Sequence, residues 1–236
     1  KYHAAKNGCI ASAYEYGMML IDGVGVTKNI KNGMKYVKYS ANYGCIEAIN
    51  AYAKMLEKSE EGLVYEDEAI KYYKMSADLG DPIGMVNYGR LLVKSKDYEN
   101  YQIAFKLFQK LVGKNNIEGM IYYCFMLDNG LGTHINHSKA NEIYRSIIDK
   151  GFVNEIFDFA EKLEKGIEFD VNVKEAVRYY KICADSGYVE AIYKYGCILY
   201  EGKYVEQNKN EAIQFFKTAS LKGHFESTKI LEQMNL

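Results

Sequence analysis

Three groups of residues have types and spacings that could support chemistry: a pair of glycines, a pair of histidines and five cysteines. Gly23 and Gly25 stand one residue apart after a short apolar run, as in loops that hold phosphate groups. His134 and His137 stand three apart, and two imidazoles at this spacing can bind a metal if acidic or thiol ligands join them. Each pattern depends on the element that would position it.

A phosphate site needs more than the glycine pair. It requires a preceding strand, with either a third glycine or a P-loop lysine at the correct offset, and position 28 is Lys where the third glycine would be. The pair recurs as Gly130 and Gly132, and in a shortened form as Gly202. This recurrence predicts a bend between two helices and not a ligand site.

The histidines and the remaining polar residues predict no reaction chemistry. No acidic or thiol ligand stands close in sequence to His134 and His137, so a solvated loop is favoured over a zinc site. No Ser, His or Asp is accompanied in the repeat pattern by a general base and by a third residue that would orient that base, as covalent catalysis requires. The sequence therefore predicts no catalytic residue, no metal and no cofactor, and hence a protein that is not an enzyme.

The composition is that of a folded protein with few signs of a charged partner. The 236 residues are 48% hydrophobic and 26% charged, and 30 Lys and Arg nearly balance 31 Asp and Glu. No basic block is present, so no nucleic-acid partner is expected. No apolar run approaches the ~20 residues of a bilayer crossing, so no membrane insertion is expected. The N-terminus, KYHAAKNG, has neither an initiator Met nor a signal-peptide layout, which indicates a fragment of a longer chain.

The chain is predicted to be all-α and repetitive. Pro82 is its one proline, and apolar residues recur at helical spacing. A closing glycine recurs every 35 or 36 residues, and asparagine replaces it once. Both residue types suit the left-handed backbone with which many helices end. The closing positions are Gly8, Gly44, Gly80, Asn115, Gly151, Gly187 and Gly223.

Two helices are predicted within each period. The first carries a column of small residues, which lets a neighbouring helix come close: Gly17, Ala53, Gly89, Cys124, Ala160 and Gly196. The second carries another small column, followed three and four residues later by bulky pairs that fill the space between repeats: Gly33, Ala69, Ala104, Ala140, Ala176 and Ala212.

Gly17, the Gly23-x-Gly25 pair, Lys28-Asn29 and the closing Ser-Ala-x-x-Gly resemble the Sel1-like repeat, a relative of tetratricopeptide repeats. The resemblance covers a single array over 1–236. It comprises the tail of a preceding repeat (1–8), six repeats (about 9–44, 45–80, 81–115, 116–151, 152–187 and 188–223) and a C-terminal capping helix (224–236), in which Glu232 takes the small position. The resemblance implies a right-handed α/α superhelical solenoid of antiparallel helix pairs, with first helices on the concave face. It also implies a role in protein–protein interaction.

The cysteines do not match the disulfide pattern of secreted relatives. Bacterial secreted members of the family join the two helices of each repeat with a disulfide, which requires two cysteines in every period. The cysteines here do not follow that pattern: Cys9, Cys45, Cys124, Cys183 and Cys197. Buried free thiols in a reducing compartment are therefore favoured, and a cytoplasmic location is expected.

Functional residues are predicted on the face of each first helix opposite its buried stripe, where they would line the concave groove. The groove would be cationic in its first half, apolar and aromatic in repeat four, and acidic beyond. Aromatic and arginine side chains dominate interface energetics, although the rings could instead pack against adjacent first helices. The predicted partner-binding residues are Tyr14, Lys54, Asn87, Arg90, Ile121, Tyr122, Phe125, Phe157, Asp158, Glu161, Tyr193 and Lys194.

The predicted function is that of a scaffold or adaptor, which binds an extended or helical partner segment across repeats two to five. Arg90 and Lys54 would hold an acidic part of the ligand, and Tyr122, Phe125 and Phe157 would seat an apolar anchor. One alternative is a regulatory or targeting array of a larger enzyme, such as a protein kinase, whose catalytic domain lies outside this sequence. A secreted repeat protein is a third possibility.

Overall fold

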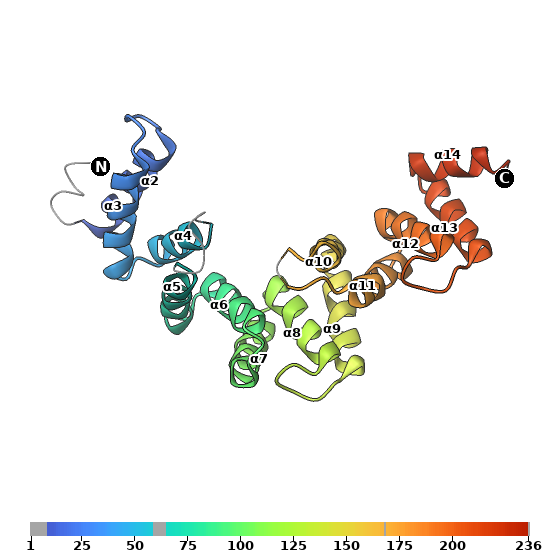
Figure 1. Cartoon of the computed structure of the whole chain (residues 1–236), viewed down its shortest axis with the longest axis horizontal. Helices are drawn as coiled ribbons and strands as arrows, with labels where there is room; N and C mark the ends of the chain where they lie inside the picture. Colours follow the sequence, from blue (N-terminus) through green and yellow to red (C-terminus); the bar gives the residue numbers. More distant parts are fainter. Residues whose placement is uncertain (1–8, 59–64, 168, 236) are drawn as a thin grey trace. The chain divides into compact units, whose positions relative to one another are not determined.

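The computed structural model describes residues 9–58, 65–167 and 169–235. Over these ranges the chain forms thirteen α-helices and no strand, which confirms the predicted all-α class. The helices belong to two compact units, of which the first ends at Asn116 and the second begins at Ile117. Figure 1 shows that successive helices pack as pairs within each unit.

Each unit contains three helix pairs, and the second unit ends with a further helix. In the first unit the pairs are α2 (Ile10–Asp22) with α3 (Ile30–Asn42), α4 (Ile46–Glu57) with α5 (Glu66–Asp78), and α6 (Pro82–Lys94) with α7 (Tyr98–Gly113). In the second they are α8 (Ile117–Asn129) with α9 (His137–Asp149), α10 (Val153–Lys165) with α11 (Val173–Asp185), and α12 (Val189–Glu201) with α13 (Lys209–Leu221), followed by α14 (Phe225–Gln233). Among the helices described, none combines the length and apolarity that a bilayer crossing requires.

The closing position of each described repeat has left-handed backbone, as predicted. The φ angle is 54° at Asn115, the one position where glycine is replaced. At the five glycines it lies between 82° and 91°: Gly44, Gly80, Gly151, Gly187 and Gly223. Gly8 lies outside the described residues. Because an L side chain is strained in this region and asparagine least so, the residue types at these positions follow from the backbone.

The glycine pairs form turns that join the first helix of a repeat to the second. Gly23 has a φ of 76°, and its N–H donates to the Met19 carbonyl at 2.9 Å. After the turn, the Asn29 N–H donates to the Leu20 carbonyl at 2.7 Å, and its side chain accepts from Asn32 N at 3.1 Å. Asparagine begins the second helix in the same way at Asn136, Asn172 and Asn208. The turn's backbone groups are thus used within the repeat.

A further turn glycine was missing from the predicted series. Gly166 has a φ of 65° and ends α10 just as Gly23 ends α2. It lies 36 residues after Gly130 and 36 before Gly202 (166 − 130 and 202 − 166). The predicted series included Gly202, which also lacks a second glycine two residues later, but omitted Gly166.

The small columns mark the closest approach of the two helices in a repeat. A Cβ atom on Gly17 would lie 2.9 Å from the Gly33 carbonyl oxygen, and one on Gly33 would lie 2.7 Å from that of Gly17. Such distances to backbone atoms leave no room for a methyl group. At Gly89 and Gly196 the rings of Phe108 and Phe216 take this space.

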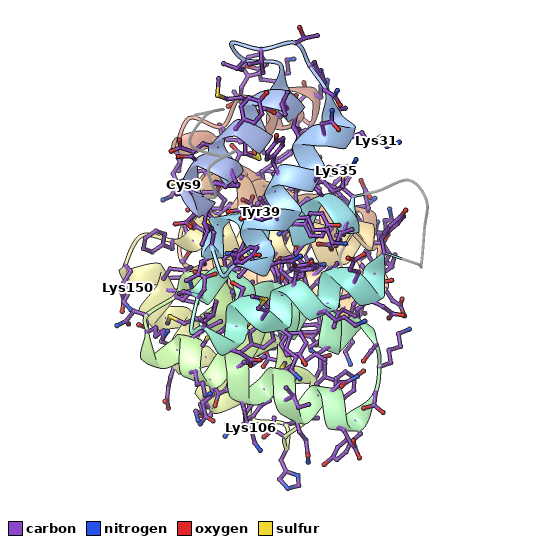
Figure 2. All side chains as sticks on the ribbon, turned by 90° about the vertical axis from the view of Figure 1, so that its left-hand side faces the viewer. Cys9, Lys31, Lys35, Tyr39, Lys106 and Lys150 are labelled. Carbon is purple, nitrogen blue, oxygen red and sulfur yellow. The ribbon has the colours of Figure 1, made fainter. Side chains whose placement is uncertain are left out.

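Bulky side chains of the second helices form the core between repeats. Four residues after the small column, each is at most 1% exposed: Val37, Tyr73, Phe108, Tyr144, Tyr180 and Phe216. The opposite face of these helices is polar; in Figure 2, Lys31, Lys35 and Tyr39 follow one another along α3. Glu232 on α14 is exposed, as expected of a terminal helix.

Replacing Asn115 tests whether its backbone conformation determines the residue type. Asn115→Ala should lower the free energy of unfolding by about 1 kcal/mol, because alanine is strained at positive φ. Asn115→Gly should leave it within about 0.5 kcal/mol or raise it. Urea unfolding of both variants is the measurement. Equal losses in the two would show that the amide side chain, and not the backbone, is what matters.

Candidate binding surface

Three predicted groove residues of repeat four are buried. Ile121, Tyr122 and Phe125 on α8 are 3%, 1% and 5% exposed. The Tyr122 ring meets Phe159 of α10 edge-on at 5.3 Å between centroids, and Phe125 meets the same ring at 5.7 Å. The expectation that these three side chains face a partner is therefore wrong, because the next first helix covers them.

Part of that cover comes from a residue that the prediction did not include. Phe169 lies in the loop between α10 and α11, and its ring stacks on Phe125 at 5.2 Å with an interplanar angle of 13°. It also meets Tyr122 edge-on at 6.0 Å. The turn has the same length in four repeats, and position 169 corresponds to Val26, Thr133 and Val205. The available signal was an aromatic ring at a position where the other turns carry smaller side chains.

The predicted cationic end of the groove is largely neutralised within the first unit. Arg90 forms an ion pair with Glu57, with 2.6 Å between Nη2 and Oε1, and the Arg90 side chain is only 12% exposed. Asn87 donates from Nδ2 to the Ile83 carbonyl at 3.0 Å. Lys54 is exposed, and Tyr14 is half-buried against the core of α3 to α6. Of these residues, Lys54 alone presents an exposed cation.

Five predicted residues of the second unit lie on its first helices α10 and α12 and keep exposed area. We define the α10–α12 surface as Phe157, Asp158, Glu161, Tyr193 and Lys194. Asp158 is exposed and the other four are partly exposed. Phe157 contacts the ring of Tyr188, the N-cap of α12, at 5.4 Å, which links the two first helices. Tyr193 stacks on His224 at 4.3 Å. Burial and a hydrogen bond with Cys197 raise the pKa of Tyr193 to about 12.

A carboxylate–tyrosine pair recurs inside the repeats. The tyrosine hydroxyl, sixteen residues further on, donates to the carboxylate at 3.0 Å from Tyr73 to Glu57, at 3.2 Å from Tyr144 to Asp128 and at 2.8 Å from Tyr180 to Glu164. Each acid directly follows the leucine of its first helix, and each tyrosine is the bulky core residue of the second. The sequence signal was present at this fixed spacing, but the prediction did not use it.

In two of these pairs a cation from the following repeat completes the contact. Arg90 of α6 binds Glu57, and Lys194 of α12 lies 3.0 Å from Glu164. Although burial of Glu164 opposes its charge, hydrogen bonds from Tyr180 and Lys194 lower its pKa. Arg90 and Lys194, predicted as ligand contacts, thus also hold one repeat to the next.

The third pair is the most buried charged group of the second unit. The Asp128 side chain has no exposed surface and forms an ion pair with Arg178 of α11. His137 Nδ1 lies 2.9 Å from its other oxygen. Burial raises the pKa of Tyr144 and of Tyr179 well above the usual range, so both hydroxyls keep their protons as donors. This network ties α8, α9 and α11 together.

The histidines and cysteines do not form a metal site in the described part of the chain. No group of three or more His, Cys, Asp or Glu that could hold a metal occurs there. All five cysteines are free, as predicted. Cys124 and Cys183 are buried, and burial raises the pKa of Cys183 to about 12, whereas Cys9 is exposed. The prediction of buried thiols is thus correct for two of the five.

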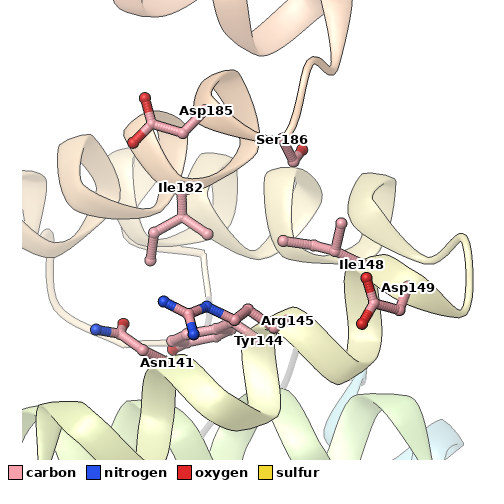
Figure 3. Close-up of a pocket in the computed structure, with 8 residues that line it drawn as sticks. All are labelled: Asn141, Tyr144, Arg145, Ile148, Asp149, Ile182, Asp185 and Ser186. Carbon is pink, nitrogen blue, oxygen red and sulfur yellow. The ribbon is translucent and has the colours of Figure 1, made fainter.

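An open cleft lies between the second helices α9 and α11. Its volume is about 390 Å³, and Figure 3 shows Ile182 pointing toward Tyr144 and Arg145 across it. Its lining combines an apolar floor with one guanidinium and two carboxylates: Asn141, Tyr144, Arg145, Ile148, Asp149, Ile182, Asp185 and Ser186. A similar cleft lies between α3 and α5 in the first unit, which makes it a general feature of adjacent second helices.

The helix pairs, their glycine turns and their small columns recur in a known protein family. The family model described as Sel1 repeat matches six segments: 10–44, 46–81, 82–114, 117–152, 163–188 and 189–224. This chain is a Sel1 repeat protein. Each segment overlaps one of the six predicted repeats, and four of the segments end one residue beyond the predicted boundary. Proteins built from this repeat generally act as scaffolds for protein–protein interaction and are typically not catalytic.

Two solved structures share the fold. One is c5321, a protective antigen of uropathogenic Escherichia coli with an SLR fold; it is 20% identical, with a TM-score of 0.64 over 98% of this chain and 50% of that chain. The chain thus spans about half the length of that protein. The other is a Sel1 repeat protein from Oxalobacter formigenes, 22% identical, with a TM-score of 0.56 over 90% of this chain and 88% of that chain. A comparison with curated proteins finds no match.

Phe125 should now behave as a core residue. Phe125→Ser is expected to lower the free energy of unfolding by about 3–5 kcal/mol, because it leaves a cavity beneath Phe159 and Phe169. The matched control Phe225→Ser, at a ring that is 65% exposed, should change it by less than about 0.5 kcal/mol. Chemical denaturation followed by circular dichroism measures both. Similar small effects in the two variants would contradict the burial of Phe125.

The Lys194–Glu164 contact should make a pH-dependent contribution. Because the pKa of Glu164 is lowered in the folded protein, the contribution is present above the ordinary value of 4.5 and is lost as the pH falls through the lowered pKa. Lys194→Met should therefore cost up to about 1 kcal/mol at pH 7 and less as the pH falls below 4.5 through the lowered pKa. Lys165→Met, at a more exposed pair, is the control. A cost that does not change with pH would point to lost packing.

Proposed function

We propose that this protein binds a segment of a partner protein on the α10–α12 surface. The main support is that Phe157 contacts the N-cap of α12 and Lys194 of α12 contacts Glu164 of α10, while all five predicted residues of these two first helices keep exposed area. Phe157 and Tyr193 supply aromatic area, and Asp158 and Glu161 supply charge at the edges. This combination is typical of the centre and rim of protein interfaces.

The surroundings of these residues favour a preformed surface. Phe157 lies against Tyr180 at 5.2 Å as well as against Tyr188, so its ring is held from two sides. Lys194 is fixed by Glu164 and lies 5.3 Å from the Tyr180 ring centre. Side chains that are held in place lose little conformational freedom on binding, which favours affinity.

Fewer of the remaining predicted residues are accessible to a partner than the sequence indicated. Tyr122 and Phe125 are core, so the apolar anchor of a partner would meet Phe157 and Tyr193 instead. Arg90 is already paired with Glu57, so of the two predicted groove cations in the first unit only Lys54 is exposed. The proposal therefore centres on the second unit.

Selection of peptides tests the proposal. An array of random 12-residue peptides is incubated with the labelled protein, and the strongest binders are remeasured by fluorescence anisotropy. Phe157→Ala and Tyr193→Ser should each weaken them at least about tenfold, the scale of an interface aromatic. The matched control Tyr98→Ser, at a ring that is 66% exposed on α7, should leave binding unchanged.

Unfolding curves of the same variants separate binding from stability. Phe157→Ala and Tyr193→Ser should remain folded at the assay temperature. If both variants fold and every selected peptide binds them as well as it binds the unaltered protein, the α10–α12 surface is not the binding site.

A further inference from the structure

We propose that the first unit binds an acidic segment of a partner protein across its second helices α3, α5 and α7. The α10–α12 surface belongs to the other unit, so this inference goes beyond the proposed function and does not depend on it. Its basis is a set of six exposed lysines, two on each of three successive second helices. We define them as the lysine strip: Lys31, Lys35, Lys71, Lys74, Lys106 and Lys110.

The repeat places one lysine of each pair at the same position. Lys35, Lys71 and Lys106 each stand two residues after the buried small residue of their helix. Two residues advance a helix by about 200°, so these lysines lie on the side turned away from the first helix, and all three are exposed. In the second unit the same position holds Glu142, an ion-paired Arg178 and Gln214. The row of lysines is therefore confined to the first unit.

The lysine strip is not neutralised by the fold. None of its six lysines forms an ion pair or a hydrogen bond within the described residues, although other lysines of the same unit do. Lys38 lies 2.8 Å from an oxygen of Glu68, and Lys94 lies 2.8 Å from one of Glu66. The strip thus keeps a positive charge that a ligand could compensate.

The lysines also repel one another along their helices. Lys31 and Lys35 stand four residues apart on α3 (Figure 2), a helix that has no acidic residue. Lys106 and Lys110 repeat this spacing on α7. Like charges four residues apart destabilise a helix, and a carboxylate between them would remove the repulsion. An acidic ligand therefore gains from both lysines of each pair.

The two units differ in the sign of their net charge. Residues 1–116 include 16 Lys and Arg against 13 Asp and Glu, which gives +3. Residues 117–236 include 14 against 18, which gives −4. The near-neutral whole chain thus hides a basic half, and such an asymmetry indicates a charged partner.

Acids at the ends of the helices limit the width of the strip. Asp67 and Glu99 lie in the first turns of α5 and α7, and Asp78 is the last residue of α5. A single extended chain that crosses the middle of the helices would meet the lysines and avoid these carboxylates. A bilayer or a nucleic-acid duplex is broader and would bring its phosphates against them. The partner that fits is therefore one protein segment with several Asp or Glu residues.

Binding of an acidic peptide gives the first test. The probe is a fluorescein-labelled peptide of twelve glutamates, and its binding to the whole protein is followed by fluorescence anisotropy. The triple change Lys35→Gln, Lys71→Gln and Lys106→Gln should weaken binding at least about tenfold at low salt and less at high salt, because salt screens exposed charges. The variant should stay folded, since all three side chains are exposed. Failure of the unaltered protein to bind the peptide would overturn the inference.

A matched triple change separates the strip from net charge. Lys174→Gln, Lys209→Gln and Lys217→Gln remove three charges from exposed positions on the second helices α11 and α13. This variant should bind the peptide as tightly as the unaltered protein does. Equal weakening by the two triple variants would show attraction to net charge alone and would overturn the site.

Competition identifies the class of partner. A DNA duplex of twelve base pairs and phosphatidylserine vesicles are each added to the complex of protein and labelled peptide. Unlabelled peptide should displace the probe at a lower concentration of negative charge than either of them. Stronger displacement by the duplex or by the vesicles would assign the lysines to nucleic acid or to lipid, and the acidic protein segment would be wrong.

Discussion

The closest approach of the two helices in a repeat is the constraint on which the other features depend. Where Gly17 meets Gly33, a single methyl group would collide with a backbone oxygen. Once two helices touch at that point, the residues on either side have fixed neighbours. The leucine of the first helix and the bulky core residue of the second then face each other in every repeat. The period of 35 or 36 residues is the length of chain needed to return to the same contact.

The carboxylate–tyrosine pairs are a consequence of that register. The acid is the residue directly after the leucine, so it lies beside the core on the first helix. The tyrosine sixteen residues later donates a hydrogen bond from its hydroxyl to that carboxylate. A buried tyrosine needs a partner for its hydroxyl, and a partly buried carboxylate needs donors. The pair satisfies both needs, and Arg90 or Lys194 from the next repeat neutralises the charge. The polar contact thus joins neighbouring repeats as well as the two helices of one.

Features that repeat could be predicted from the sequence, and features that occur once could not. The helix pairs, the turns and the left-handed Asn115 follow from recurrence, since six copies of a pattern report one geometry. The groove was derived from helical angles alone, and the exposure of Asp158 agrees with that derivation. It failed at Tyr122 and Phe125, where Phe159 and Phe169 cover the predicted face. The position of Phe169 recurs in the other turns as Val26, Thr133 and Val205, but only here does it carry an aromatic ring that can cover α8.

The departures from the repeat are also where this protein differs from any other array of the same architecture. A helix pair with a standard core and standard turns gives a scaffold, but it specifies no ligand. In the second unit, Asp128 is fully buried in an ion pair with Arg178, whereas Glu57 and Glu164 at the same position are 28% and 20% exposed, and Phe169 closes the apolar face of α8. With that face closed, the predicted groove rings of the second unit that keep exposed area are Phe157 and Tyr193, on repeats five and six. Repeat four therefore presents none of its predicted contact residues to solvent.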